Sequence, residues 1–113
     1  MNKILLIPGS FNPITNAHVD MALAAKRAVN ADSIYFIPAH DTYVAKKKTL
    51  IPGYCRVELI NSMDNCEENN IHALDIETTS FFPQRTYNTI SQLREEAEKN
   101  YEFNEYYICL GMD

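Results

Sequence analysis

The sequence lacks a long apolar run, an excess of basic residues and any paired-cysteine motif. Its first apolar run stops at Pro8, and no segment approaches the ~20 apolar residues that a membrane span requires. The absence of a signal-like start makes a cytoplasmic location the default expectation. With ten Lys and Arg against fifteen Asp and Glu, the net charge is -5, which argues against nucleic acid as the main partner.

Three cysteines are present, and their spacing excludes the common redox and zinc motifs. Cys55, Cys66 and Cys109 form no CxxC pair and lie far apart, so reduced structural thiols are expected. No internal repeat or low-complexity linker interrupts the 113 residues, of which 46% are hydrophobic. The chain is therefore one globular domain or part of one.

Apolar runs and amphipathic segments alternate along the chain. Strands are predicted at residues 3–8, 33–38, 71–76 and 106–110. Helices are predicted at residues 16–29, at residues 52–63 with Pro52 in the first position, and after Thr86 as the N-cap residue. This order predicts an α/β fold with a Rossmann-like, doubly wound parallel sheet, which binds ligands beyond the carboxyl ends of its strands.

The first strand leads into a loop that has the features of a phosphate-binding site. Gly9 frees the backbone to turn, and Thr15 or Asn16 can cap the next helix, whose amino end favours an anion. If the loop holds a triphosphate, His18 can donate to a nonbridging oxygen and Thr15 can donate its hydroxyl nearby. The alternatives are an ordinary turn between strand and helix and a histidine that only packs against the sheet.

The loops after the next strands carry further candidates. Lys46, Lys47 and Lys48 form a triplet that either is a solvated face or brings a lysine to a phosphate, with His40 as a further candidate. Residues 77–87 are rich in rings and hydroxyls, so they either bind a flat heterocycle or cover the edge of the core, and Glu77 is interpreted as exposed. Gly111 and Asp113 follow the fourth predicted strand as a Gly-x-Asp pattern, which by itself is weak evidence for a contact with a ribose.

The residues of the first loop also resemble the motif of a known superfamily. Gly9-Ser10-Phe11-Asn12-Pro13-Ile14-Thr15-x-x-His18 closely resembles the signature of the nucleotidyltransferase alpha/beta phosphodiesterase superfamily, written (H/T)xGH. Ala17 stands where glycine is common. The chain looks most like the nicotinate or nicotinamide mononucleotide adenylyltransferases. Further matching segments are Tyr43-x-x-Lys46-Lys47-Lys48-x-Leu50-Ile51-Pro52-x-Tyr54-x-Arg56, Arg85-Thr86-Tyr87-Asn88-Thr89-Ile90-x-x-Leu93 and Ile108-x-Leu110-Gly111-x-Asp113.

The resemblance implies adenylyl transfer from ATP to a pyridine mononucleotide, giving a dinucleotide and pyrophosphate in NAD biosynthesis. Mg²⁺ would be carried by ATP, without a metal site on the protein. The catalytic residues implied are His18, Thr15 and Lys47. The residues implied for ATP are Gly9, Ser10, Phe11, Gly111 and Asp113. The residues implied for the acceptor are Asn12, Lys46, Lys48, Thr79, Thr86 and Tyr87. Pantetheine-phosphate adenylyltransferases, which share the first loop, are the alternative.

The C-terminal end departs from the family pattern. By resemblance, a complete domain continues to a second phosphate loop, written ISxTxxR, which does not occur here. We therefore expect a chain truncated at its C-terminus, with residues 1–113 forming the N-terminal part of a single nucleotidyltransferase domain. By itself it would be weakly active or inactive, or a non-catalytic nucleotide-binding module. Homo-oligomers could form through the edge of the fourth strand.

Overall fold

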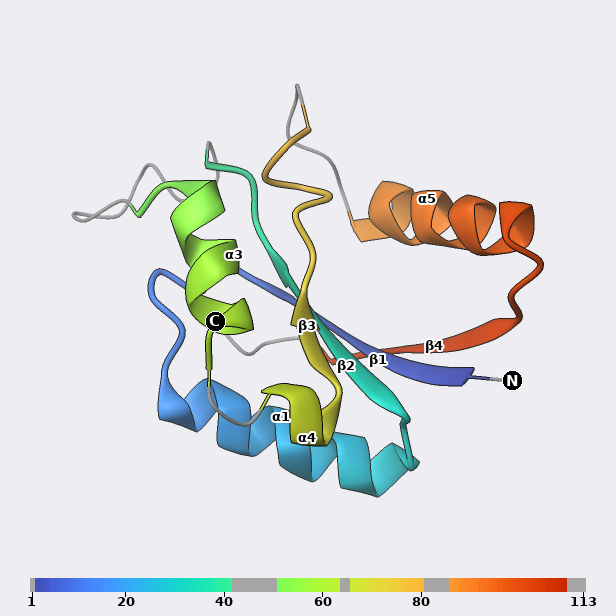
Figure 1. The fold of residues 1–113 in the computed structure, drawn as a ribbon, viewed down its shortest axis with the longest axis horizontal. Coiled ribbons are helices and arrows are strands. Elements are labelled where there is room, and N and C mark those ends of the chain that lie inside the picture. Colours follow the sequence, from blue (N-terminus) through green and yellow to red (C-terminus); the bar gives the residue numbers. More distant parts are fainter. Residues whose placement is uncertain (1, 42–50, 64–65, 81–85, 110–113) are drawn as a thin grey trace.

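A four-stranded parallel sheet with helices on both faces forms the centre of the molecule. The computed structural model describes residues 2–41, 51–63, 66–80 and 86–109. The elements in chain order are β1 (Asn2–Gly9), α1 (Asn16–Val29), β2 (Ser33–Pro38), α3 (Gly53–Asn61), α4 (Cys66–Asn69), β3 (Ile71–Ala73), α5 (Thr86–Lys99) and β4 (Asn104–Ile108). The predicted α/β, Rossmann-like fold is confirmed, and Figure 1 shows the sheet between α1 and α5.

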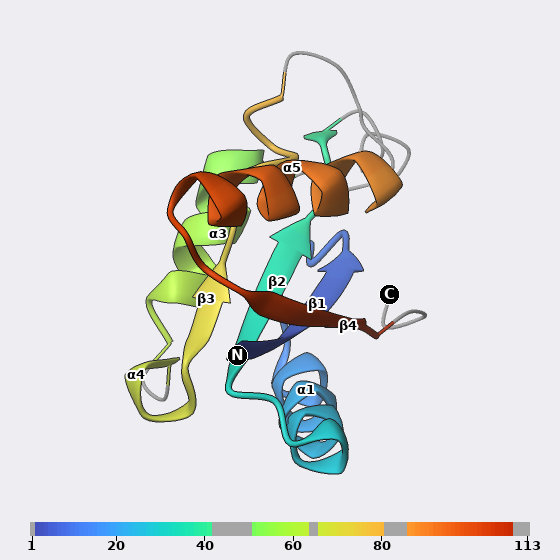
Figure 2. The same ribbon diagram turned by 90° about the vertical axis from the view of Figure 1, so that its right-hand side faces the viewer.

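The strand order is β3-β2-β1-β4, and every neighbouring pair is parallel. From β1 the chain steps outward to β2 and β3, and α5 then returns it to the opposite side of β1 (Figure 2). The direction of winding therefore reverses between β1 and β4. In open parallel sheets, the crevice beyond the carboxyl ends of two such strands is where ligands bind.

Alternating side chains of the central strands fill two cores. Leu5 and Ile7 of β1 point to one face, where they join buried residues of α1, α3 and α4. Ile4 and Leu6 point to the other face, where Ile90 and Leu93 of α5 pack. This alternation explains the continuous apolar run of β1, because a strand covered on both faces has no polar side.

The bounds of α1 and β2 agree with the sequence prediction, and those of the other predicted strands and of α3 differ from it. β3 ends at Ala73 rather than at Ile76, because the amide of Thr79 and the hydroxyls of Thr78 and Thr79 all donate to the Asp75 carbonyl and turn the chain. Pro52 caps α3 rather than being its first residue, and β4 starts two residues early. The short helix α4 had no periodic signal, and Thr86 is the first residue of α5, not its N-cap.

The outer edge of β3 is closed by a side chain instead of a further strand. Asn61 of α3 accepts a hydrogen bond from the Ala73 amide (2.8 Å) and donates to the Ala73 carbonyl (3.4 Å). Because an amide side chain offers one donor and one acceptor, it satisfies both backbone groups of the edge residue. The Asn61 side chain thus takes the place of a neighbouring strand at Ala73.

Candidate functional site

The loop after β1 is held in place by a buried aromatic ring. Phe11 is fully buried, and its ring meets Phe36 of β2 and His18 of α1 edge to face, with centroid distances of 5.1 and 5.3 Å. Its φ angle of 47° is rare for a bulky residue, and such strain is found at functional loops. Phe11 was predicted to bind ATP. None of the residue is accessible in the ligand-free fold, so its described role is to hold the loop against β2 and α1.

His18 and Thr15 form one hydrogen-bonded unit at the start of α1. Thr15 is the N-cap residue; its amide donates to His18 Nδ1 (3.0 Å), its Oγ1 lies 2.8 Å from the same nitrogen, and the His18 amide donates to that Oγ1 (3.4 Å). An amide can only donate, so Nδ1 is an acceptor. In the neutral ring the proton is therefore on Nε2, on the far side of the ring from the cap.

The other predicted residues of this loop also contact neighbouring segments. The Gly9 carbonyl accepts from the Ala39 amide (2.8 Å), which extends the contact between β1 and β2 past the strand ends. Asn12 accepts a hydrogen bond from the Ile51 amide through Oδ1 (2.8 Å). The Ser10 carbonyl accepts from Nη1 of Arg56 (2.8 Å). The loop is thus fixed along its length before any ligand binds.

Arg56 and Glu77 are two buried charged residues that sequence reasoning did not assign to the site. Arg56 is fully buried and binds Ser10, Ile51 and Asp41. A signal for it existed, because Arg56 and Ile60 lie four residues apart and therefore share the buried face of α3. Glu77 was interpreted as exposed, which is wrong, since only 5% of it is accessible.

The Glu77 carboxylate joins the turn after β3 to α5. The hydroxyl of Thr89, itself fully buried, donates to Glu77 Oε2 (2.9 Å). Burial raises the pKa of the Glu77 carboxyl above its ordinary value, while the Thr89 hydrogen bond and the charge of His40 act in the opposite direction. This carboxylate is therefore a structural tie between two segments that carry predicted acceptor residues.

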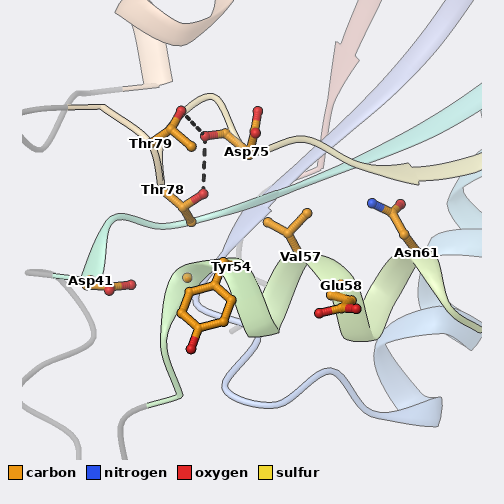
Figure 3. A pocket seen from close by; sticks show the side chains of 9 residues that line it. Asp41, Tyr54, Val57, Glu58, Asn61, Asp75, Thr78 and Thr79 are labelled. Atoms are coloured by element: carbon orange, nitrogen blue, oxygen red, sulfur yellow. Dashed lines mark hydrogen bonds between the residues drawn. The ribbon is translucent and has the colours of Figure 1, made fainter.

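Two of the predicted acceptor residues, Thr79 and Tyr87, have described side chains in the segments that follow β3. Thr79 donates to the Asp75 carbonyl (2.8 Å) and lines a hollow of about 440 Å³ beside α3. Figure 3 shows this hollow, with Tyr54 and Val57 on one wall and the acidic side chains of Asp41, Glu58 and Asp75 around it. Among the described residues, none from the loop after β1 lines it. Tyr87 is 77% exposed on α5.

Several predicted site residues lie outside the described residues. They are the lysines Lys46, Lys47 and Lys48 and the C-terminal Gly111 and Asp113. Thr86 is placed as the first residue of α5, but its side chain is likewise outside them. The lysine and Gly-x-Asp roles therefore stay predictions.

In residues 2–41, 51–63, 66–80 and 86–109, no group of three or more His, Cys, Asp or Glu side chains is arranged to hold a metal ion. The three cysteines are free, as expected, and burial raises the pKa of the Cys66 thiol. Within the same described residues, no helix has the length and apolarity to cross a membrane.

Comparison with known proteins identifies the class to which this fold and loop belong. Residues 6–113 match the family model described as cytidylyltransferase-like, and the chain belongs to that family. The superfamily expected from the first loop is confirmed.

Individual relatives have more specific names than the family model. The chain is 30% identical over 112 residues to the "Probable nicotinate-nucleotide adenylyltransferase" of Maridesulfovibrio salexigens, covering 98% of this chain and 49% of that protein. It is 32% identical over 112 residues to the protein of the same name from Clostridium botulinum, covering 98% and 55%. The chain thus spans about half the length of these relatives.

A solved structure has the same fold. The Plasmodium falciparum nicotinic acid mononucleotide adenylyltransferase complexed with NaAD aligns with a TM-score of 0.66 and 20% identity, over 96% of this chain and 51% of that chain. At this identity the match supports the fold alone.

Proposed function

We propose that this chain carries the nucleotide-binding part of an adenylyltransferase that joins ATP and nicotinate mononucleotide. The 5′-phosphate oxygen of the mononucleotide attacks the α-phosphorus of ATP. The bond from that phosphorus to the oxygen bridging to the β-phosphate breaks, and pyrophosphate leaves. The product is the dinucleotide. ATP enters as its Mg²⁺ complex, so the ion is part of the substrate.

The observation that carries the proposal is the His18–Thr15 unit at the start of α1, in the segment that follows the carboxyl end of β1. A phosphate acceptor is already anionic at neutral pH, so no general base is needed, and catalysis consists of alignment and charge stabilisation. A histidine whose Nδ1 is held by a backbone amide presents Nε2–H as a fixed donor. Such a preorganised donor stabilises the charge that develops on the phosphoryl oxygens.

The acceptor residues form the less constrained half of the proposal. Thr79, Thr86 and Tyr87 lie in sequence between Glu77 and Thr89, whose hydrogen bond joins the turn after β3 to α5, and we propose that this segment selects the pyridine ring. Lys46, Lys47 and Lys48 offset the repulsion between two anions, while Gly111 and Asp113 accompany the ATP ribose. A cytoplasmic location stays part of the proposal. The formation of homo-oligomers is also part of the proposal.

A competition between acceptors tests the proposal. The folded chain is incubated with Mg²⁺, ATP and equal amounts of nicotinate mononucleotide, nicotinamide mononucleotide and phosphopantetheine, and the products are identified by mass. We expect the nicotinate dinucleotide to accumulate first, as the names of the relatives suggest. Dephospho-coenzyme A as the main product would transfer the assignment to pantetheine-phosphate adenylyltransferases. Binding of ATP without any product would favour a non-catalytic module.

A further inference from the structure

The Arg56 side chain is the most heavily engaged charged group among the residues that the structure describes. It lies in the first turn of α3, yet none of its surface is accessible to solvent. Arginine is almost never fully buried unless its charge is paired and its donors are used. We therefore expect the groups that the guanidinium binds to explain why Arg56 is buried.

The three partners of Arg56 come from three separate parts of the chain. Nη1 donates to the Ser10 carbonyl in the loop after β1 (2.8 Å). Nε donates to the Ile51 carbonyl just before α3 (2.8 Å). Nη2 forms an ion pair with the Asp41 carboxylate after β2. The guanidinium binds these acceptors through three different nitrogens of one rigid plane, whereas the three donors of a lysine ammonium are all on one rotatable nitrogen.

A second contact strengthens the same junction. The Ile51 amide donates to Asn12 Oδ1 (2.8 Å), so both backbone groups of Ile51 are hydrogen-bonded. Asn12 and Ser10 belong to the loop that carries the signature motif. The loop after β1 and the segment before α3 are therefore connected by two independent hydrogen-bonded routes, one through Asn12 and one through Arg56.

Asp41 and Ile51 mark the two ends of the connection between β2 and α3. By binding both residues, one guanidinium fixes Asp41 and Ile51 relative to each other. Because the same guanidinium also holds Ser10, the position of these ends is fixed relative to the loop after β1. A substitution that breaks one of these three contacts should therefore also alter the positions of the other two partners.

We propose that Arg56 is a positioning residue that sets the geometry of the loop after β1 by locking Ser10, Asp41 and Ile51 to one buried guanidinium. It does not touch a substrate. Its effect on ATP passes through the loop backbone, and that part of the inference rests on the function proposed above. The locking itself is a property of the ligand-free fold.

The first test measures backbone amide exchange in the ligand-free chain. In Arg56→Lys, we expect the amides of residues 10–12 and of Ile51 to exchange about tenfold faster or more, because a hydrogen bond to a charged group is lost. The Ile34 amide in the centre of the sheet reports global unfolding. Arg27→Lys, at an exposed arginine near the end of α1, is the matched control and should leave all of these rates unchanged.

Asp41→Asn provides a second, milder variant in case Arg56→Lys does not fold. It keeps the shape of a side chain that is 46% exposed and removes only the charge. We expect faster amide exchange at residues 10–12, which Asp41 does not contact in the bonds described. In the double variant Arg56→Lys/Asp41→Asn, we expect the change in exchange free energy to be smaller than the sum of the changes in the two single variants. Unchanged exchange at residues 10–12 in Asp41→Asn, or full additivity, would overturn the proposal.

The second test separates this inference from the proposed function. Binding of Mg·ATP is measured for the wild-type chain and for each folded variant, and we expect about tenfold weaker binding in Arg56→Lys, with Arg27→Lys unchanged. Faster loop exchange with unaltered ATP affinity would contradict the link to the nucleotide. If the wild-type chain binds no ATP, the proposed function fails, while the exchange rates still decide whether Arg56 locks the three segments.

Discussion

At the scale of single residues, the proposal depends on His18 and on the hydrogen bonds that join it to Thr15. The Thr15 amide binds Nδ1, so the imidazole is both part of the helix cap and a donor through Nε2. The signature motif predicted both residues at the start of a helix. It did not predict that they would bind each other, because either Thr15 or Asn16 could have been the cap.

Replacing His18 tests its role in charge stabilisation. We expect His18→Ala to lower kcat by about 10²–10³-fold in the active protein, as is usual when one donor to a developing oxyanion is removed. Turnover is measured by pyrophosphate release. His72→Ala, at an exposed histidine of β3, is the control and should behave like wild type. A His18→Ala protein that is folded and retains near wild-type turnover would remove His18 from the mechanism.

Glu77 gives a prediction about pH. Its folded-state pKa is raised above the ordinary carboxyl value of 4.5, so the folded state binds the proton more tightly than the unfolded state. Unfolding free energy should therefore rise as pH falls from neutral through the raised pKa toward 4.5. Glu77→Gln lacks this gain but keeps an acceptor for Thr89. A difference in stability between the two proteins that stays constant over this range would contradict the prediction.

The residues that sequence reasoning missed share a physical cause. Arg56 and Glu77 are charged, and a charged side chain is exposed by default. Their burial depends on partners far along the chain, such as Ser10 for Arg56 and Thr89 for Glu77. Such pairings arise from the three-dimensional arrangement of the loops, which local patterns do not encode. The signature motif, in contrast, is local, and the His18–Thr15 placement followed from it.

At the scale of elements, apolar periodicity accounts for most of the fold. The bounds of α1 and β2 agree with the prediction because each has an uninterrupted pattern between clear end signals. β3 was predicted too long because Leu74 and Ile76 continue the apolar pattern while the chain already turns at Asp75. Both side chains pack against the α5 face of the core outside the strand.

The end of α1 depends on a residue in the left-handed conformation. Asn30 has φ 55° and ψ 43°, and its amide donates to carbonyls of the last turn. We expect Asn30→Ala to destabilise the protein by about 1–2 kcal/mol, because alanine is strained in this region, and Asn30→Gly to be close to neutral. Thermal or denaturant unfolding measures both. Equal stability of the Ala and Gly variants would refute this account of the cap.

The start of α3 packs too closely against the turn after β3 to accept a side chain. A Cβ at Gly53 would lie 2.7 Å from Thr78 Cβ and 3.0 Å from Asp41 Oδ1. We expect Gly53→Ala to cost about 1–3 kcal/mol of unfolding free energy. Adding Thr78→Gly should recover part of that loss, since it removes the clashing atoms. A Gly53→Ala protein as stable as wild type would show that the contact is looser than described.

At the scale of the whole molecule, the arrangement of the sheet puts the signature loop where ligands bind in open parallel sheets. The winding reverses between β1 and β4, and the loop after β1 lies at the carboxyl end beside that reversal. The alternation of strands and helices predicted a doubly wound parallel sheet. The order β3-β2-β1-β4 required the structure, because several orders satisfy the same alternation.

The central claim is that the adenylyl group of ATP moves to a pyridine mononucleotide. The most direct measurement follows two isotope labels, one on the α-phosphorus and one on the γ-phosphorus of ATP, in a reaction of the folded chain with Mg²⁺ and nicotinate mononucleotide. We predict that the α label appears in the dinucleotide and the γ label in pyrophosphate. Transfer of the γ label to the acceptor would contradict the account.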